Sequence, residues 1–132
     1  MARLTKDLPE SRITLEGKQG SGSPPGNRGE VLQVYVRLVW GKLRPGTWER
    51  YEQHYHERVV PSSKGIKGLS ERQLLRSTED PDEGISLSIW DTVENMHNYD
   101  VSDERQELAK ELEHLYRGEY SVKHFEVKST NR

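Results

Sequence analysis

The alternation of apolar and polar positions is clearest where the chain reads GISLSIWDTVENMHNY, from Gly84 to Tyr99. Three aliphatic residues alternate with two serines and a Trp over residues 85–90, which is the period-two pattern of a β-strand. Asp91, followed three positions later by Glu94, predicts a helix start, with Thr92 as a competing N-cap. We therefore expect the Trp to lie at the sheet edge beneath a helix, in a fold of the α+β or α/β class.

Three further segments predict strands. Val31–Trp40 is apolar on both faces, as in a strand that is buried on two sides. Leu69–Ser77 is expected to form a second strand, which a turn at Thr78–Gly84 joins to the strand described above. Tyr120–Val127 is expected to form the last strand.

Two helical regions separate these strands. Trp48, Tyr51, Tyr55 and Val59 recur at helical spacing and predict one helix with an aromatic inner stripe. The second region follows Thr92, breaks near residues 100–102 and restarts at Ser102, because Ser followed by two acidic residues is typical of a helix start. We expect it to continue to Arg117, with Gly118 just past its end.

The predicted order is β-α-β-β-α-β, the ferredoxin-like plan of the α+β class, with a four-stranded antiparallel sheet and both helices on one face. Several strands carry apolar residues on both faces, whereas a one-sided sheet would show polar residues on its bare face. We therefore expect a homodimer joined sheet to sheet.

The chain divides into three parts. Residues 1–29 are expected to form an N-terminal arm, because the stretch GKQGSGSPPGNRG buries too little apolar area to offset its backbone entropy. This arm is either a flexible linker or a segment that docks on a protein partner through its few aliphatic residues. Residues 30–128 form the predicted domain, and residues 129–132 form a C-terminal tail.

Composition excludes several classes of function. Charged residues make up 32% of the chain and hydrophobic ones 31%, so the core of a single copy is expected to be thin. A net charge of −2 gives no case for nucleic-acid or anionic-membrane binding. No apolar run approaches the roughly 18 residues of a membrane span, and the first ten residues lack the apolar core of a signal peptide. The absence of Cys excludes disulfides and thiol nucleophiles, and a cytoplasmic location is expected.

Residues 31–128, about three quarters of the chain, resemble the antibiotic biosynthesis monooxygenase family. The resemblance rests on an ordered set of short motifs: Pro45-Gly46, Gly68-Leu69, Leu74-Leu75-Arg76, Asp80-Pro81, Trp90-Asp91-Thr92, Tyr99, Ser102 and the closing Val122–Val127. It implies a dimeric α+β barrel of the ferredoxin-like type, with a pocket between sheet and helices in each subunit. It also implies action on small aromatic or polyphenolic substrates, often with no cofactor, although many members have no demonstrated chemistry.

A branch of related proteins opens haem, and its residues can be sought in this chain. Those members carry a His seven residues after the Ser of the second helix, and an Asn near the end of the first strand. This chain has Ala109 at the first position and no Asn within Val31–Trp40. Both departures argue against haem degradation by that arrangement.

The candidate catalytic residues are His54, His97 and Arg37. Arg37 interrupts an apolar strand, so it requires either a carboxylate or an anionic ligand as its partner. If the substrate is a phenol, His54 or His97 would remove its proton, and Arg37 or Arg72 would hold the resulting anion. The anion would then reduce dioxygen directly, and no cofactor is expected.

Aromatic residues are the candidate substrate-binding set, because planar rings suit a planar ligand and Tyr hydroxyls add polar contacts. The alternative is that they only fill the core. With Arg72, the candidates are Tyr51, Tyr55, Trp90 and Tyr99. No histidine spacing predicts a metal site, since His54 and His56 point in nearly opposite directions from a helix.

Two functions of different classes follow. The first is a cofactor-independent monooxygenase that acts on a small aromatic metabolite. The second is a non-catalytic dimeric-barrel module that binds a small ligand or another protein, with the N-terminal arm as its tether. A pocket that is filled by its own aromatic side chains would favour the second.

Overall fold

The computed structural model describes residues 33–131, and residues 35–125 form one compact unit. Its sheet has the strand order β4-β5-β3-β6, formed by β3 (Tyr35–Lys42), β4 (Leu69–Arg76), β5 (Glu83–Trp90) and β6 (Ser121–Glu126). Strands β3 and β4 both pair antiparallel with β5. The predicted ferredoxin-like sheet is therefore confirmed.

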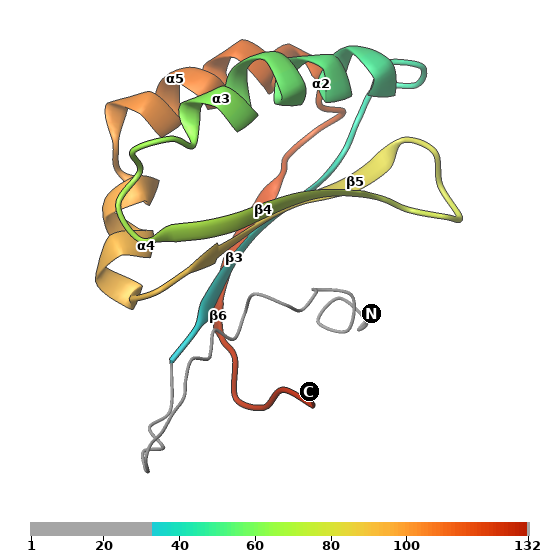
Figure 1. Ribbon diagram of the computed structural model, residues 1–132. Coiled ribbons are helices and arrows are strands. Elements are labelled where there is room, and N and C mark those ends of the chain that lie inside the picture. Colours follow the sequence, from blue (N-terminus) through green and yellow to red (C-terminus); the bar gives the residue numbers. More distant parts are fainter. Residues whose placement is uncertain (1–32, 132) are drawn as a thin grey trace, which may run out of the picture. The chain divides into compact units, whose positions relative to one another are not determined.

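The helices lie on one face of this sheet (Figure 1). The first helical region comprises α2 (Trp48–His54), a π-helical segment η2 (Tyr55–Val59) and a short α3 (Val60–Ser62). The second comprises α4 (Val93–Asp100), α5 (Asp103–Leu112) and a 3-10 turn η3 (Glu113–Leu115). None of the described helices has the length and apolarity that spanning a bilayer requires.

The break between α2 and η2 was not predicted. Tyr51, Tyr55 and Val59 are all buried and recur every four residues. An α-helix has only 3.6 residues per turn, so a strict four-residue repeat would drift around its surface. The wider π-helical turn keeps the three side chains on the sheet-facing side, and π-helical segments of this kind interrupt α-helices at such places.

Strand register assigns each residue to one of two faces. Residues paired across β3 and β5 share a face, so Arg37 lies beside Ser88 and Leu38 lies beside Leu87. The helix-facing side carries Arg37, Val39 and Gly41 of β3, with Arg72 and Leu74 of β4. The far face carries mostly apolar side chains, namely Val36, Leu38, Trp40, Leu75, Ile85, Leu87 and Ile89.

The predicted bounds of the first strand were wrong. Residues 31 and 32 of the predicted range lie outside the described residues. Residues 33 and 34 are not part of the strand, which begins at Tyr35 and continues to Lys42, past the predicted end at Trp40. The reason is its partner: Tyr35 pairs with Trp90 and Lys42 pairs with Glu83, which are the two ends of β5. The length of a strand is set by the hydrogen bonds that its neighbour supplies, and not by the length of the apolar run in its own sequence.

The second helical region breaks and restarts as predicted, but it starts at the competing N-cap, Thr92, instead of at Asp91, and it ends early. Thr92 is the N-cap of α4 and accepts a hydrogen bond from the N–H of Asn95, whereas Asp91 binds the Asn95 side chain. Ser102 caps α5 in the same way. Helical structure stops at Leu115 instead of Arg117, because Tyr116 is extended and pairs with Leu43 in an isolated bridge.

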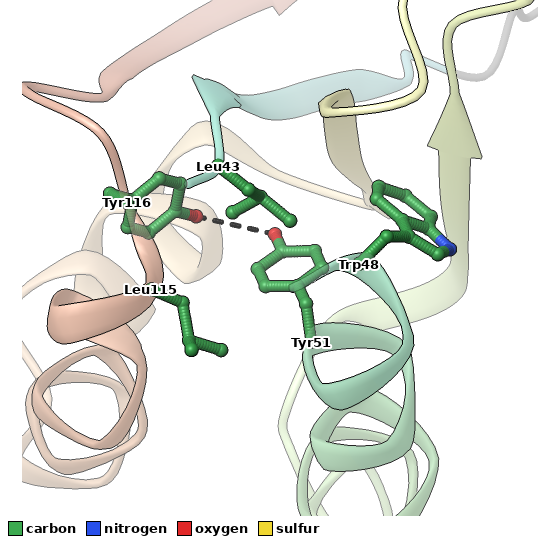
Figure 2. Close-up of a cluster of buried hydrophobic side chains, with 5 residues drawn as sticks. All are labelled: Leu43, Trp48, Tyr51, Leu115 and Tyr116. Carbon is green, nitrogen blue, oxygen red and sulfur yellow. Dashed lines mark hydrogen bonds between the residues drawn. The ribbon is translucent and has the colours of Figure 1, made fainter. Parts of the chain in front are cut away.

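Two rings pack directly on glycines of the central strands. Gly41 and Gly84 are cross-strand partners, and a methyl group on either would meet the ring of Tyr116 or of Trp48 respectively. The two rings belong to a buried cluster with Leu43, Tyr51 and Leu115, shown in Figure 2. This cluster joins the start of α2 to the segment that follows α5.

The remaining predicted segments can be placed only in part. The predicted N-terminal arm, residues 1–29, lies outside the described residues. Val34 and residues 126–131 belong to a second unit, in which the N–H of Val127 donates to the carbonyl of Val34 at 2.9 Å. Residues 127–131, which include residues 129–131 of the predicted tail, have no regular secondary structure.

Candidate functional site

An open hollow runs between the first helical region and the edge strand β4. We call it the outer groove, and its volume is about 640 Å³. Both hydrophobic and charged side chains line it: Trp48, Glu52, Tyr55, His56, Val60, Ser63, Leu69, Ser70, Glu71, Arg72, Gln73, Leu74 and Arg76. This volume lies within the range of about 300–1,000 Å³ that is typical of small-molecule sites.

A second hollow, which we call the inner cavity, lies between the sheet and the helices and measures about 80 Å³. Three arginines and five tyrosines line it together with small and aliphatic residues: Arg37, Val39, Tyr51, Tyr55, Val59, Arg72, Ser86, Tyr99, Arg105, Leu108, Ala109, Leu112, Tyr116, Tyr120 and Val122. A dry cavity of about 150 Å³ is known to hold benzene, so the inner cavity is too small for an aromatic ring. Its own side chains nearly fill it.

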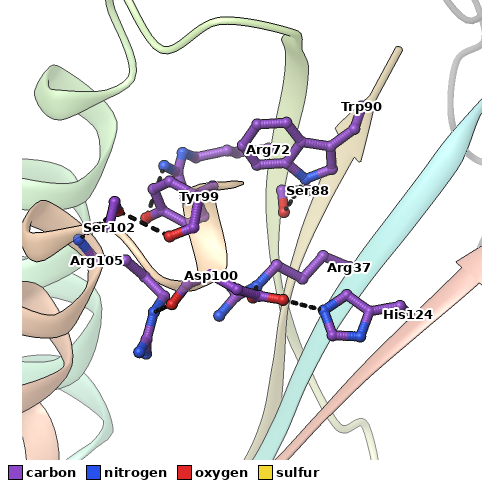
Figure 3. A network of polar contacts seen from close by, with 9 residues as sticks. All are labelled: Arg37, Arg72, Ser88, Trp90, Tyr99, Asp100, Ser102, Arg105 and His124. Atoms are coloured by element: carbon purple, nitrogen blue, oxygen red, sulfur yellow. Dashed lines mark hydrogen bonds and ion pairs between the residues drawn. The ribbon is translucent and has the colours of Figure 1, made fainter. Parts of the chain in front are cut away.

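Tyr55 and Arg72 line both hollows, so they lie where the outer groove meets the inner cavity. The Nε of Arg72 donates to Ser63 Oγ at 2.6 Å, and its Nη2 donates to the hydroxyl of Tyr99 at 3.3 Å. The guanidinium also lies over the Tyr99 ring, 5.4 Å from the ring centre (Figure 3). These contacts hold one positive charge at the junction of the two hollows.

The hydroxyl of Tyr55 is buried and has no hydrogen-bond partner within the described part of the chain. Burial raises the pKa of this hydroxyl to about 12, against the opposing charge of Arg72. It is therefore protonated at neutral pH and offers one donor and two acceptor positions to a ligand. A buried polar group without a partner normally costs stability, which makes this one a candidate for ligand contact.

The other tyrosines of the inner cavity are paired. The hydroxyls of Tyr51 and Tyr116 lie 3.2 Å apart, as Figure 2 shows. Burial raises the pKa of both hydroxyls, so both stay protonated near neutral pH and neither can act as a general base. These two residues close the cavity toward the cluster around Leu43.

Arg37 is paired with a carboxylate of this chain, so its guanidinium does not form an open binding site for an anionic ligand. Its Nε donates to Oδ1 of Asp100 at 2.5 Å, and the other carboxylate oxygen lies 2.5 Å from Nε2 of His124 (Figure 3). Burial alone would raise the pKa of Asp100, but the hydrogen bond and charge of Arg37, with a contribution from His124, lower it below its usual value. Arg37 also lies over the Tyr99 ring, 5.3 Å from its centre.

The structure brings five of the eight sequence candidates to the inner cavity: Arg37, Tyr51, Tyr55, Arg72 and Tyr99. Trp90 lies beside this set, fully buried, with its ring centre 5.2 Å from that of Tyr99. Its indole N–H donates to Ser88. Trp90 therefore supports the Tyr99 ring without lining either hollow.

The two candidate bases lie elsewhere. His54 pairs with Oε1 of Glu111 at 2.7 Å and lines neither hollow. Bonding to Arg58 and to His54 lowers the pKa of Glu111 to about 2, so His54 serves a contact between helices through an ionised carboxylate. His97 is exposed on α4, where its ring centre lies 5.1 Å from that of His124.

Sequence reasoning missed His56. The sequence predicted only that it points away from His54; its side chain is largely exposed and lines the outer groove, with Nε2 3.5 Å from Oε2 of Glu52. Among the described residues that line the two hollows, it is the only imidazole. Its position in the sequence could have indicated this place, because it directly follows Tyr55 and lies four residues after Glu52, which puts it beside Glu52 on the helix surface.

A model of the family described as antibiotic biosynthesis monooxygenase matches residues 34–111, more than half of the chain. Solved structures show the same fold. A proposed antibiotic biosynthesis monooxygenase from Nitrosomonas europaea has a TM-score of 0.65 and 11% identity, over 76% of this chain and 95% of that chain. A similarly described protein from Bordetella bronchiseptica has a TM-score of 0.62 and 23% identity, over 69% of this chain and 93% of that chain.

A conserved protein from Methanosarcina mazei Go1 is also similar, with a TM-score of 0.61 and 15% identity. That alignment covers 71% of this chain and 91% of the archaeal one. No curated protein matches this sequence. At these identities the structural likeness concerns the fold alone.

Proposed function

We propose, on the premise that this chain belongs to the antibiotic biosynthesis monooxygenase family, that it binds a small phenolic compound in the outer groove and oxidises it with dioxygen. One observation carries the proposal. A buried Tyr55 hydroxyl, without a hydrogen-bond partner among the described residues, lies beside Arg72 at the junction between the outer groove and the smaller inner cavity. A phenolate oxygen would satisfy both groups, because it accepts from the hydroxyl and neutralises the guanidinium.

The groove is suited to an aromatic ring. Trp48, Tyr55 and Leu74 supply apolar surface along its length, and Arg76 already lies over the Trp48 ring at 5.0 Å. A planar substrate can pack on these side chains while its oxygen points toward Arg72. Rotation of Arg72 away from Ser63 would join the groove to the inner cavity and let a substituent enter.

The positive charge of Arg72 favours the ionised form of a bound phenol, so it lowers the cost of removing the proton. The proton passes to solvent or to His56, which lines the same groove. The phenolate then transfers electrons to dioxygen. When a ring CH2 conjugated to the phenolate becomes C=O, one oxygen atom enters the product and the other leaves as water, so the substrate supplies all four electrons.

Oxygen uptake tests this proposal. Purified full-length protein is incubated with hydroquinones, naphthols and anthrones in an oxygen-electrode cell, and products are analysed by mass spectrometry after reaction in labelled dioxygen. We expect one dioxygen consumed per substrate, and a product that has gained one labelled oxygen and lost two hydrogens. Arg72→Gln should lower kcat/KM by about 100-fold, as loss of a charge-stabilising group does. Arg50→Gln, an exposed arginine on α2, is the matched control.

A second function is favoured by a different observation. The inner cavity is nearly filled by its own tyrosines, as expected of a binding module without catalysis. In that case phenols would bind in the outer groove and quench Trp48 fluorescence, but no member of the panel would promote oxygen uptake. Binding without turnover therefore favours the module, and turnover that is unchanged in Arg72→Gln contradicts the role given to Arg72.

We also propose that the chain is a homodimer joined through the far face of the sheet. That face carries Leu38 and Trp40 on β3 and Ile85 on β5, and no described helix covers it (Figure 1). Leu87 and Ile89 of this face are already buried within the chain, whereas Leu38, Trp40 and Ile85 are half-buried. Half-buried apolar side chains of this kind favour further burial against a second copy. A protein partner for residues 1–29 and a cytoplasmic location stay predictions from the sequence.

A further inference from the structure

Three metal-ligating side chains meet where α4 ends beside β6. His97 and Asp100 come from α4 and His124 comes from β6, and one ligand atom from each lies within 4.8 Å of the other two. Neither the resemblance to the family nor the proposed oxygenase assigns a role to this group, which we call the His–Asp cluster. Figure 3 shows the Asp100 and His124 side chains pointing toward each other.

We propose that the His–Asp cluster binds a divalent transition-metal ion of the Zn²⁺ class through His97, Asp100 and His124. Two imidazoles and one carboxylate are a ligand set that Zn²⁺, Co²⁺ and Ni²⁺ accept, and three protein ligands leave a fourth position for water. The site is separate from the outer groove, so this inference goes beyond the proposed oxygenase.

The spacing of the residues brings the first two ligands together. His97 and Asp100 are three residues apart on α4, so their side chains project from the same helix face. Each needs only a side-chain rotation to reach a common ion. The third ligand, His124, is contributed by a strand 24 residues after Asp100.

The separation of the two imidazole rings is compatible with ligation of one ion. Their ring centres lie 5.1 Å apart and their planes are inclined by 87°. With Zn–N bonds of about 2.0–2.1 Å and a tetrahedral angle, the centres of two ligating rings lie about 5 Å apart. The observed ring separation therefore requires little movement of the two histidines.

The carboxylate is held by a second set of contacts. Arg37 occupies Oδ1 of Asp100, which leaves Oδ2, now directed at His124, to ligate the ion. Arg105 donates its Nε to the main-chain oxygen of Asp100 at 2.7 Å and so holds the end of α4. Hydrogen bonds of this kind orient ligating carboxylates in metal sites.

The His–Asp cluster is accessible to solvent, and two of its three side chains are partly buried. The His97 side chain is exposed, whereas those of Asp100 and His124 are 21% and 30% exposed. An ion can enter from solvent without any rearrangement of the backbone. The guanidinium of Arg37 repels a cation, so we expect micromolar rather than nanomolar affinity.

Metal titration tests the inference. Tag-free full-length protein, freed of metal with a chelator and then dialysed, is titrated with Zn²⁺ in competition with a chromophoric chelator. We expect one site with a dissociation constant of about 1 µM, and at least a 20-fold weaker constant in His97→Gln and in His124→Gln. His114→Gln, an exposed histidine on η3, should bind Zn²⁺ as the wild type does.

Co²⁺ provides a second readout, because its visible absorption reports ligands and geometry. Intense visible bands on Co²⁺ addition, lost in His97→Gln and retained in His114→Gln, support the site. The proposal is overturned by an absence of saturable Zn²⁺ binding at 100-fold excess over about 1 µM, or by equal affinity of His97→Gln and wild type. Circular dichroism confirms that each variant is folded. No phenol is present, so these outcomes are distinguishable from failure of the oxygenase proposal.

Discussion

Arg37 of β3 and Asp100 at the end of α4 form a hydrogen-bonded ion pair, with 2.5 Å between Nε and Oδ1. The arginine side chain is only 7% exposed, and 63 residues separate the partners in the sequence. The pair fixes the end of α4 against the central strand, and it places a guanidinium in the wall of the inner cavity.

Removing this pair should destabilise the fold. Asp100→Asn leaves the buried Arg37 guanidinium without its ionic partner, and we expect the free energy of unfolding to fall by about 2 kcal/mol. Urea denaturation followed by Trp fluorescence, with a chelator present, measures the change. Asp103→Asn is the control, because Asp103 is exposed in the first turn of α5 and should cost less than about 1 kcal/mol. Equal losses in both variants would contradict the importance of the pair.

Stability should depend on pH in the acid range. The folded-state pKa values of Asp100 and Glu111 are lowered, to about 2 for Glu111, whereas the unfolded chain keeps ordinary values. Their stabilisation is therefore fully present above the unfolded-state pKa of about 4, and is lost as pH falls toward the folded-state pKa. We expect the urea midpoint to decrease steadily from pH 5 to pH 2, and less steeply in Glu111→Gln. A midpoint that is constant over this range would contradict both pKa shifts.

Two tyrosines of the inner cavity should respond oppositely to loss of their hydroxyls. Tyr51→Phe leaves the Tyr116 hydroxyl buried without a partner, and we expect a loss of about 1 kcal/mol in the free energy of unfolding. Tyr55→Phe removes a hydroxyl that has no partner, so stability should be unchanged or higher by up to about 1 kcal/mol. Urea denaturation of both variants measures the difference in sign.

The Tyr55→Phe variant also separates an effect on stability from an effect on ligand binding. If the Tyr55 hydroxyl contacts a phenolic ligand, Tyr55→Phe should bind phenols about 10-fold more weakly, despite its unchanged stability. A Tyr55→Phe variant that is clearly destabilised would mean that the hydroxyl already has an internal partner.

Much of the fold follows from local pattern. The alternation over residues 85–90 and the Asp/Pro/Gly turn before it predict the β4–β5 hairpin, which the structure confirms. Features that depend on distant partners were not predictable. The length of β3 is set by its pairing with β5, and helical structure ends at Leu115 because Tyr116 leaves it to pack on Gly41.

The candidate site divides in the same way. The need of Arg37 for a carboxylate or an anion was visible in its apolar strand, but the identity of Asp100 depends on where α4 ends. Tyr55 and Arg72 could be named from residue type, whereas their shared position between two hollows depends on the packing of η2 on β4. The approach of His124 to His97 requires β6 to lie beside α4, and no local spacing encodes it.

Ser102, one of the residues that carry the family resemblance, should act as a helix cap. Its Oγ accepts from the N–H of Arg105 at 3.1 Å, at the first turn of α5. We expect Ser102→Ala to lower the free energy of unfolding by about 1 kcal/mol and Ser102→Asp to restore it, because Asp is also a good N-cap. Any oxygen-uptake activity should be the same in both variants. A loss of turnover in Ser102→Asp with full stability would assign Ser102 to the chemistry instead.

Charge introduced on the far face of the sheet should separate the proposed dimer. Leu38 lies at the centre of that face, paired with Leu87, so Leu38→Glu would bury a carboxylate between two sheets. We expect wild type to elute as a dimer at about 50 µM in size-exclusion chromatography with light scattering, and Leu38→Glu as a folded monomer. Val101→Glu makes the same change of apolar to charged on a residue that is 71% exposed between α4 and α5, and should remain dimeric. A wild-type protein that is monomeric at this concentration, or a Leu38→Glu variant that stays dimeric, would contradict an interface at this face.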